Sequence, residues 1–224
     1  MWNNISKYLV NKKVLEIGCG IGQKTNMICN YTNKVTAIDI SQESINIAKK
    51  SFDNEKVSFL VMDASNLKFN DKSFDVVITT DSFHEIDPLI QNKVLEEMTR
   101  MADTIIFIEP NEISVTNELF KIFDPNENHS LRIKNSMEKA FKHMKNHNYK
   151  QIENGYYNDI NKFDSEEEMY NTLLDWWNDI KVPKDKYEKN QMIGQIKTVL
   201  QNFNMLENME VFERINYYVF VKEK

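Results

Sequence analysis

Cysteine, proline and glycine are all scarce in this sequence. Its 224 residues include two cysteines, four prolines and five glycines. A structural disulfide between Cys19 and Cys29 is not expected, because Cys19 stands inside a short run of glycines. We interpret both cysteines as small apolar residues. The sequence has no internal repeat and no low-complexity linker, which is typical of a globular chain.

Long apolar runs and an excess of basic residues are also absent. No apolar run approaches the roughly 20 residues that cross a bilayer, and the N-terminus lacks the charged and then apolar layout of a signal peptide. We therefore expect a cytoplasmic protein with no membrane partner. The net charge of −6, without a cluster of Lys and Arg interleaved with aromatic residues, argues against a nucleic-acid partner.

Three of the five glycines fall together, directly after a short apolar run. Residues 14–22 read Val-Leu-Glu-Ile-Gly-Cys-Gly-Ile-Gly. The apolar residues predict a buried parallel strand, and the glycines let the backbone turn sharply and bring its N–H groups against a ligand before a helix begins. Such a turn favours a nucleotide-like ligand. The dinucleotide fingerprint Gly-x-Gly-x-x-Gly is not met, because its third glycine position holds Gln23.

Three further segments follow this glycine run in order. Val35 to Asp39 is a second buried-strand pattern that ends in an acid, and Val57 to Ala64 and Val76 to Ile86 are a third and a fourth. Together with the glycine run and the preceding Glu16, the series resembles the motifs of S-adenosylmethionine-dependent methyltransferases of the Rossmann-like class. The resemblance covers roughly half of the chain.

The resemblance implies S-adenosylmethionine as the cofactor. Asp39 lies 19 residues beyond Gly20, where Rossmann-type sites place a carboxylate on the ribose hydroxyls, although a helix cap is the alternative. Asp63 with Ala64 is implied to contact the adenine ring, with a cap or turn as the alternative. The residues predicted to bind the cofactor are Glu16, Gly18, Cys19, Gly20, Gly22, Asp39, Ile40, Asp63, Ala64 and Thr80.

Methyl transfer from a sulfonium is a direct displacement, so the site must align the acceptor and exclude water and needs a base only for some acceptors. The resemblance places His84 near the reacting methyl group. Either His84 is catalytic and accepts a proton from the acceptor, or it packs and forms hydrogen bonds under the cofactor loop. The residues predicted to bind the acceptor are Asp81, Ser82, Glu109, Asn111, Tyr170, Trp176 and Trp177.

No metal site is expected in this sequence. His143 and His147 lie four residues apart on a predicted helix, which places both imidazoles on one face. No cysteine or carboxylate cluster adjoins them in sequence, and Lys142 and Lys145 stand beside them. We therefore interpret this face as solvated.

Apolar patterns of strand and helix type alternate through the first half of the chain. They predict an α/β fold with a doubly wound, mostly parallel sheet, and the resemblance implies seven strands and a helical cap insertion. Strands are predicted at 14–18, 35–39, 57–62, 74–79 and 104–109, and helices at 22–31, 42–52 and 88–101. A loop rich in Asn and Glu is predicted from Pro110 to about His129.

The length fits one domain with an elaboration better than two domains. We predict a single methyltransferase domain over 1–224, with a cofactor-binding half at 1–110, an acceptor-side elaboration at 111–205 and a terminal strand at 206–224. Two helices at 164–201 form an insertion within the elaboration, which in this family typically caps the acceptor pocket.

The sequence therefore predicts a methyltransferase that acts on a small-molecule acceptor. DNA amine methyltransferases carry an Asp/Asn-Pro-Pro-aromatic motif after the fourth strand, where this chain has residues 79–82, Thr-Thr-Asp-Ser. Two alternatives stay open, a nicotinamide-dependent oxidoreductase and a non-catalytic S-adenosylmethionine-binding module. The sequence does not distinguish oxygen, nitrogen, sulfur or carbon as the accepting atom, and it does not define the oligomeric state.

Overall fold

The computed structural model describes residues 2–52, 54–175 and 180–223. Its backbone forms two compact units. The first consists of Met1–Glu109, Asn135–Tyr156 and Asn216–Lys224, and the second of Pro110–Lys134 and Tyr157–Ile215. Because strands β6 (Tyr149–Lys162) and β7 (Glu210–Lys222) each contribute residues to both units, the chain passes between the units more than once.

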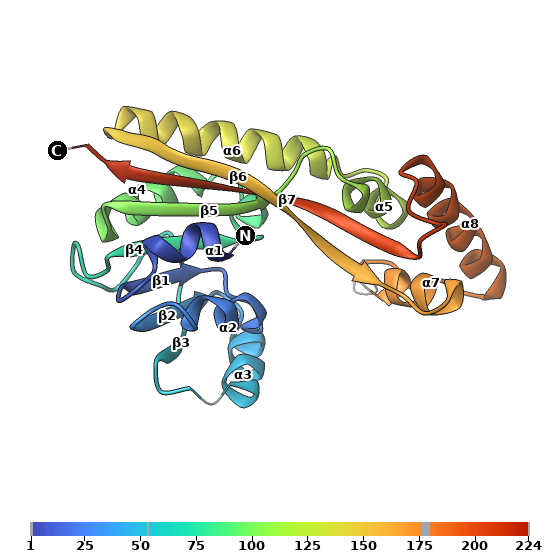
Figure 1. The fold of residues 1–224 in the computed structure, drawn as a ribbon, viewed down its shortest axis with the longest axis horizontal. Helices are drawn as coiled ribbons and strands as arrows, with labels where there is room; N and C mark the ends of the chain where they lie inside the picture. Colours follow the sequence, from blue (N-terminus) through green and yellow to red (C-terminus); the bar gives the residue numbers. More distant parts are fainter. Residues whose placement is uncertain (1, 53, 176–179, 224) are drawn as a thin grey trace. The chain divides into compact units, whose positions relative to one another are not determined.

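A seven-stranded sheet has the order β3-β2-β1-β4-β5-β7-β6 (Figure 1). The five strands before β6 are β1 (Lys13–Ile17), β2 (Lys34–Asp39), β3 (Val57–Val61), β4 (Val76–Thr80) and β5 (Thr104–Pro110). They pair in parallel, and β7 runs antiparallel. The predicted fold class is thus confirmed.

The strands of the sheet are recognisable in the sequence as apolar runs because they are buried and parallel. Every residue of β4 is buried, because helices cover a parallel sheet on both faces and leave no polar alternation. Helices α2 (Gln23–Cys29) and α3 (Gln42–Ser51) contact β2, whereas α4 (Gln91–Met101) contacts β4. The register aligns the carboxyl ends of the strands, so the loops after Ile17, Asp39 and Thr80 meet at one edge.

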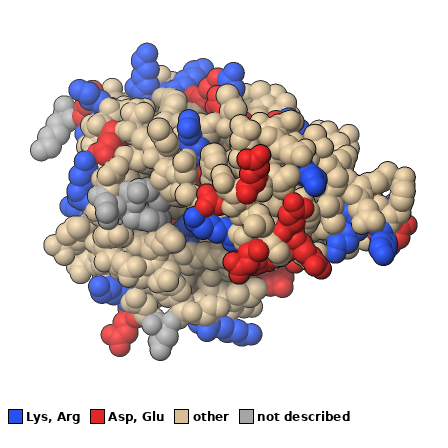
Figure 2. Space-filling view, turned by 45° about the vertical axis from the view of Figure 1, so that its right-hand side comes forward, with Lys and Arg blue, Asp and Glu red and all other residues tan. Residues whose placement is uncertain are grey.

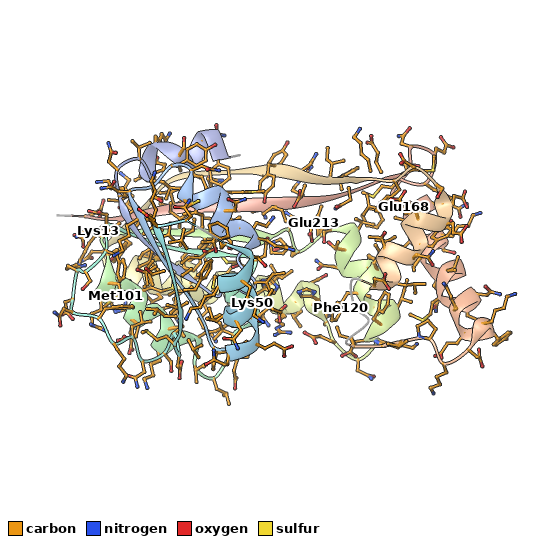
Figure 3. All side chains as sticks on the ribbon, turned by 90° about the horizontal axis from the view of Figure 1, so that it is seen from below. Lys13, Lys50, Met101, Phe120, Glu168 and Glu213 are labelled. Carbon is orange, nitrogen blue, oxygen red and sulfur yellow. The ribbon has the colours of Figure 1, made fainter. Side chains whose placement is uncertain are left out.

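A hydrophobic core of the first unit lies on the α4 side of the sheet. Side chains of β1, β4 and β5 pack there against α4 and α6 (His129–Asn146). Figure 3 shows Met101, at the end of α4, among the packed side chains of this unit. Short elements α1 (Trp2–Ile5) and η1 (Ser6–Tyr8) precede β1, and Ile5 and Leu9 are fully buried.

The second unit has a core of its own. Helices α5 (Val115–Phe123), α7 (Glu166–Asp175) and α8 (Lys186–Asn202) contribute Leu119, Leu173 and Ile196 to it. Helices α7 and α8 lie between β6 and β7 in the sequence. Within the described residues, no helix carries an apolar stretch long enough to cross a bilayer.

The predicted loop from Pro110 to His129 is wrong in one part, because it contains α5. Ser114 caps this helix by accepting a hydrogen bond from the Asn117 N–H at 3.2 Å. Apolar residues at helical spacing, among them Val115 and Leu119, bury one face of α5. The high Asn and Glu content of the segment obscured this periodicity, because the polar Asn117 lies on the buried face, where its side-chain amide donates hydrogen bonds to the Asn111 and Glu112 carbonyl oxygens.

Candidate cofactor site

The glycine turn, residues 18–22, joins β1 to α2. Gly18, Gly20 and Gly22 have φ angles of 73°, 52° and 88°, which disfavour any residue with a Cβ. A Cβ on Gly18 would lie 2.6 Å from the Cβ of Ser82, so this position also lacks room. A Cβ on Gly20 would meet no atom within 4 Å, so the turn is open to a ligand at its middle residue.

Asp39 holds this turn from the end of β2. Its Oδ2 accepts a hydrogen bond from the Gly20 N–H at 2.8 Å, and its Oδ1 accepts one from the Ser41 N–H at 2.9 Å. The cap of α3 is Ser41, whose Oγ accepts from the Ser44 N–H. Each Asp39 oxygen can accept a further hydrogen bond, so the carboxylate can fix the turn and bind a hydroxyl together. The next residue, Ile40, is 74% exposed.

Glu16 is a fully buried acid one residue before the end of β1. Its Oε2 accepts a hydrogen bond from the Thr25 hydroxyl at 2.6 Å and its Oε1 from the Thr80 hydroxyl at 3.1 Å. Burial raises the pKa of Glu16 to about 7, which these two hydrogen bonds only partly oppose. The side chain therefore links β1, α2 and β4 directly behind the glycine turn.

Asp63 and Ala64 follow β3 at the same edge of the sheet. Asp63 is exposed, and its Oδ1 accepts a hydrogen bond from the Ser65 N–H at 2.7 Å. This hydrogen bond lowers the pKa of Asp63, so the side chain is a carboxylate at neutral pH. The Met62 N–H donates to the Asp39 carbonyl oxygen at 3.0 Å, which ties this loop to the end of β2.

The segment after β4, residues 81–86, is named here the β4 loop. Asp81 has a φ of 50° and forms an ion pair with Lys24 of α2 at 3.7 Å. The Ser82 hydroxyl donates to the Ile17 carbonyl oxygen at 2.9 Å. Thr80, Asp81 and Ser82 thus lie against β1 and α2, beside the glycine turn.

His84 lies in the short helix η2 (Phe83–Glu85) of this loop and is 3% exposed. Its Nδ1 forms a hydrogen-bonded ion pair with Glu109, and its Nε2 lies 3.0 Å from Glu85. Burial opposes the charged form, but the two carboxylates prevail and raise the pKa of His84 to about 10. An imidazolium with both nitrogens engaged has no lone pair for a proton, so this geometry favours the packing role over general base catalysis.

The remaining acceptor-side predictions fall in the second unit or outside the described residues. Asn111 donates its backbone N–H to the Arg214 carbonyl oxygen at 2.8 Å. Tyr170 is 7% exposed and donates its hydroxyl to Glu166 at 3.2 Å. Trp176 and Trp177 lie outside the residues that the structure describes.

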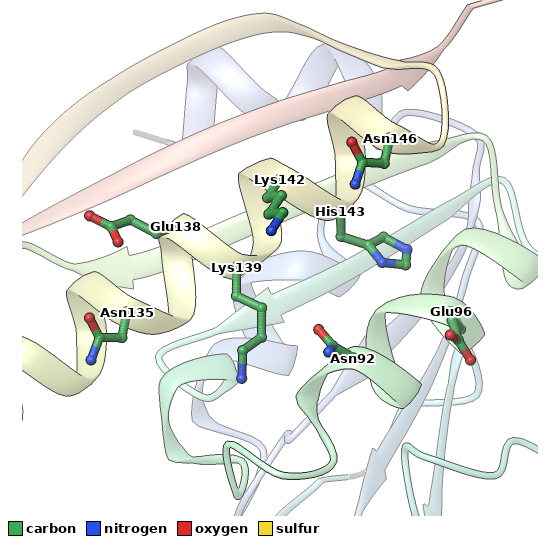
Figure 4. A pocket seen from close by; sticks show the side chains of 8 residues that line it. All are labelled: Asn92, Glu96, Asn135, Glu138, Lys139, Lys142, His143 and Asn146. Carbon is green, nitrogen blue, oxygen red and sulfur yellow. The ribbon is translucent and has the colours of Figure 1, made fainter.

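A groove of about 570 Å³ lies elsewhere in the first unit, between α4 and α6 (Figure 4). It is lined by Asn92, Glu96, Asn135, Glu138, Lys139, Lys142, His143 and Asn146, none of which is a predicted site residue.

The histidine pair of α6, His143 and His147, is not arranged as a metal site. The two rings stack with centroids 3.9 Å apart, and His147 Nδ1 lies 2.9 Å from the His143 carbonyl oxygen. The two imidazoles therefore face each other rather than converge on one point.

Sequence reasoning missed Thr25 and Gln91, which the structure places behind the site. Thr25 holds Glu16, and the Gln91 Nε2 lies within hydrogen-bonding distance of two carbonyl oxygens of the β4 loop. Neither residue belongs to a motif. Their role depends on pairing across elements, and nothing in their local sequence indicates it.

Residues 14–104 match a family model described as a methyltransferase domain. The chain contains a methyltransferase domain. The matched stretch includes the glycine turn, Asp39, Asp63 and the β4 loop. The sheet order described above is that of the Rossmann-like methyltransferase class, so the predicted family is confirmed for the matched residues.

Two relatives of known activity resemble this domain. Malonyl-acyl-carrier protein O-methyltransferase of Priestia megaterium is 30% identical over 110 residues, which is 47% of this chain and 40% of the relative. Norajmaline N-methyltransferase of Rauvolfia serpentina is 35% identical over 96 residues, which is 41% of this chain and 32% of the relative. The matches thus span less than half of these relatives.

Solved structures also resemble the chain in fold, and one of them holds a bound product of methyl transfer. Phosphoethanolamine N-methyltransferase 2 of Haemonchus contortus, in complex with phosphomonomethylethanolamine and S-adenosylhomocysteine, matches with a TM-score of 0.57. The match covers 100% of this chain and 53% of that chain, at 16% identity. At this identity the likeness concerns the fold alone.

Proposed function

We propose that this chain is an enzyme that transfers a methyl group from S-adenosylmethionine to a small-molecule acceptor. The observation that carries the proposal is the glycine turn, which is open at Gly20 and held by the Asp39 carboxylate within a methyltransferase domain. S-adenosylmethionine supplies an activated methyl group on a sulfonium.

The residues around the turn fit this cofactor. Asp39 has acceptor capacity for ribose hydroxyls, and the exposed Ile40 beside it offers an apolar contact for a base. Asp63 and Ala64, in the loop that Met62 ties to Asp39, are our proposed contacts to the adenine ring. Glu16, with a pKa near neutrality, is placed behind the turn where the ammonium group of a methionine moiety would favour its ionised form.

Two observations support a small acceptor. Figure 2 shows one face of the molecule, on which Lys and Arg side chains are scattered among Asp and Glu rather than gathered in a basic patch. This distribution and the net charge of −6 do not favour a nucleic acid as the acceptor.

The accepting atom stays open. The two relatives are named as an O-methyltransferase and an N-methyltransferase, so they do not distinguish oxygen from nitrogen. Asp81, Ser82, Asn111, Tyr170, Trp176 and Trp177 remain proposed acceptor-side residues.

The proposal is tested by following S-adenosylhomocysteine production with panels of carboxylic acids, phenols, amines and thiols. We expect turnover with members of one panel and loss of turnover in Asp39→Ala. Titration with NADH in parallel addresses the oxidoreductase alternative. Binding of NADH without binding of S-adenosylhomocysteine would contradict the proposal, and cofactor binding without turnover on any panel would favour a non-catalytic module.

A further inference from the structure

The β4 loop is held from two sides by buried polar side chains. On one side Glu109, at the end of β5, is fully buried. Its Oε1 accepts hydrogen bonds from the Phe83 N–H at 2.9 Å and the Thr79 hydroxyl at 3.4 Å, while its Oε2 pairs with His84 Nδ1. One carboxylate thus fixes the last residues of β4, the backbone of the loop and the imidazole.

On the other side Gln91, in the first turn of α4, is 1% exposed. Its Nε2 lies 3.3 Å from the Phe83 carbonyl oxygen and 3.2 Å from the Ile86 carbonyl oxygen. The same nitrogen lies 2.7 Å from Ser136 Oγ on α6. The Phe83 N–H is therefore bound by Glu109 of β5, and the Phe83 carbonyl oxygen is bound by Gln91 of α4. Displacement of the loop away from either element breaks a buried hydrogen bond.

The β4 loop is in direct contact with the glycine turn. Ser82 donates to the Ile17 carbonyl oxygen, and its Cβ occupies the space that a Cβ on Gly18 would need. Contact this close leaves no room for an independent movement of either segment. The buried Glu109 carboxylate pairs with the His84 imidazolium, so neutralising Glu109 removes one of the two carboxylates that hold the imidazole in place.

We propose that Glu109 and Gln91 are positioning residues for cofactor binding, which act through the β4 loop and do not contact the acceptor. The inference rests on the proposed function, because the loop borders the turn that would bind S-adenosylmethionine. It reassigns Glu109 from the acceptor pocket, and it gives Gln91, which no sequence motif contains, a role at the site.

The test compares Glu109→Gln and Gln91→Leu with Glu97→Gln as the matched control. Glu97 lies on α4, as Gln91 does. Like Glu109, it pairs with a cation, Arg100, and accepts a hydrogen bond from a backbone N–H, that of Leu67, but it does so away from the β4 loop. Calorimetric titration with S-adenosylhomocysteine is expected to give a Kd at least tenfold weaker in Glu109→Gln and Gln91→Leu. Glu97→Gln is expected to stay within threefold of wild type, although all three lower the thermal unfolding temperature.

A double variant and a spectroscopic signal separate positioning from general destabilisation. If Glu109 acts through His84, the two substitutions are not independent. The fold loss of S-adenosylhomocysteine affinity in the double variant Glu109→Gln with His84→Gln is then smaller than the product of the fold losses in the two single variants. The downfield ring proton of the His84 and Glu109 pair is expected in the wild-type NMR spectrum and is expected to vanish in Glu109→Gln.

Each outcome decides one of the two proposals. S-adenosylhomocysteine binding within threefold of wild type in both folded variants would overturn the positioning role alone. If Glu109→Gln does not fold, Gln91→Leu decides by the same criterion. Wild-type protein that fails to bind S-adenosylhomocysteine while it keeps the downfield proton would overturn the proposed function, and with it the role of the loop.

Discussion

Replacement of Glu16 by Gln is expected to raise the stability of the ligand-free protein in a pH-dependent way. Glu16 is fully buried, and its pKa rises from the ordinary 4.5 to about 7, chiefly by burial. A carboxyl whose folded pKa is raised contributes its full stability below pH 4.5 and loses it as pH rises through 7. A shift of this size corresponds to about 3 kcal/mol above pH 7.

The Gln side chain keeps the shape of Glu16 and both threonine contacts. One hydroxyl of Thr25 and Thr80 would still donate to the amide oxygen, and the other would accept from the amide nitrogen. We therefore expect Glu16→Gln to match wild type near pH 4.5 and to exceed its free energy of unfolding by up to about 3 kcal/mol at pH 8. If Glu16 serves the cofactor, S-adenosylhomocysteine binding weakens in the same variant.

Urea unfolding at pH 5 and pH 8, with equal m-values as a check on two-state behaviour, measures this difference. Glu97→Gln is the control, because Arg100 lowers the pKa of Glu97 below its ordinary 4.5. The contribution of Glu97 is therefore present at both pH 5 and pH 8, and we expect Glu97→Gln to be less stable than wild type by the same amount at the two pH values. A Glu16→Gln variant less stable than wild type at pH 8, or a difference that does not change with pH, would refute the reasoning.

Three further predictions concern the site. Asp39→Ala is expected to weaken S-adenosylhomocysteine binding by about 1.5–3 kcal/mol, and calorimetry showing an unchanged Kd would mean that Asp39 only braces the turn. Gly18→Ala is expected to lower the thermal unfolding temperature more than Gly20→Ala does, because only a Cβ on Gly18 would clash with Ser82. Gly20→Ala is expected to keep most of the stability of the domain and to lose S-adenosylhomocysteine binding. Equal effects of the two variants in thermal unfolding and in titration would contradict the open turn. The imidazolium of His84 is expected to stabilise the fold fully below pH 6.5 and to lose this contribution as pH rises through about 10, so the stability gap between wild type and His84→Gln should shrink over that range in urea titrations.

The sequence predicted the fold well because its signals are local, and the same signals select the residues that we propose for the cofactor. A buried parallel strand followed by glycines that require positive φ leaves few other structures, and Asp39 stands at a fixed distance along the chain from Gly20. The α5 helix was missed because its cap and apolar face lie within a segment of polar composition. The pairing of His84 with Glu109, 25 residues apart, depends on the neighbouring positions of β4 and β5, which no local pattern contains.

Calorimetric titration of the wild-type protein with S-adenosylhomocysteine tests the central claim most directly. We predict one site per chain with a Kd in the micromolar range, about −7 to −8 kcal/mol, and competition by S-adenosylmethionine for the same site. Folded protein that shows no heat of binding and no thermal shift at saturating ligand would contradict the assignment of the glycine turn as a cofactor site.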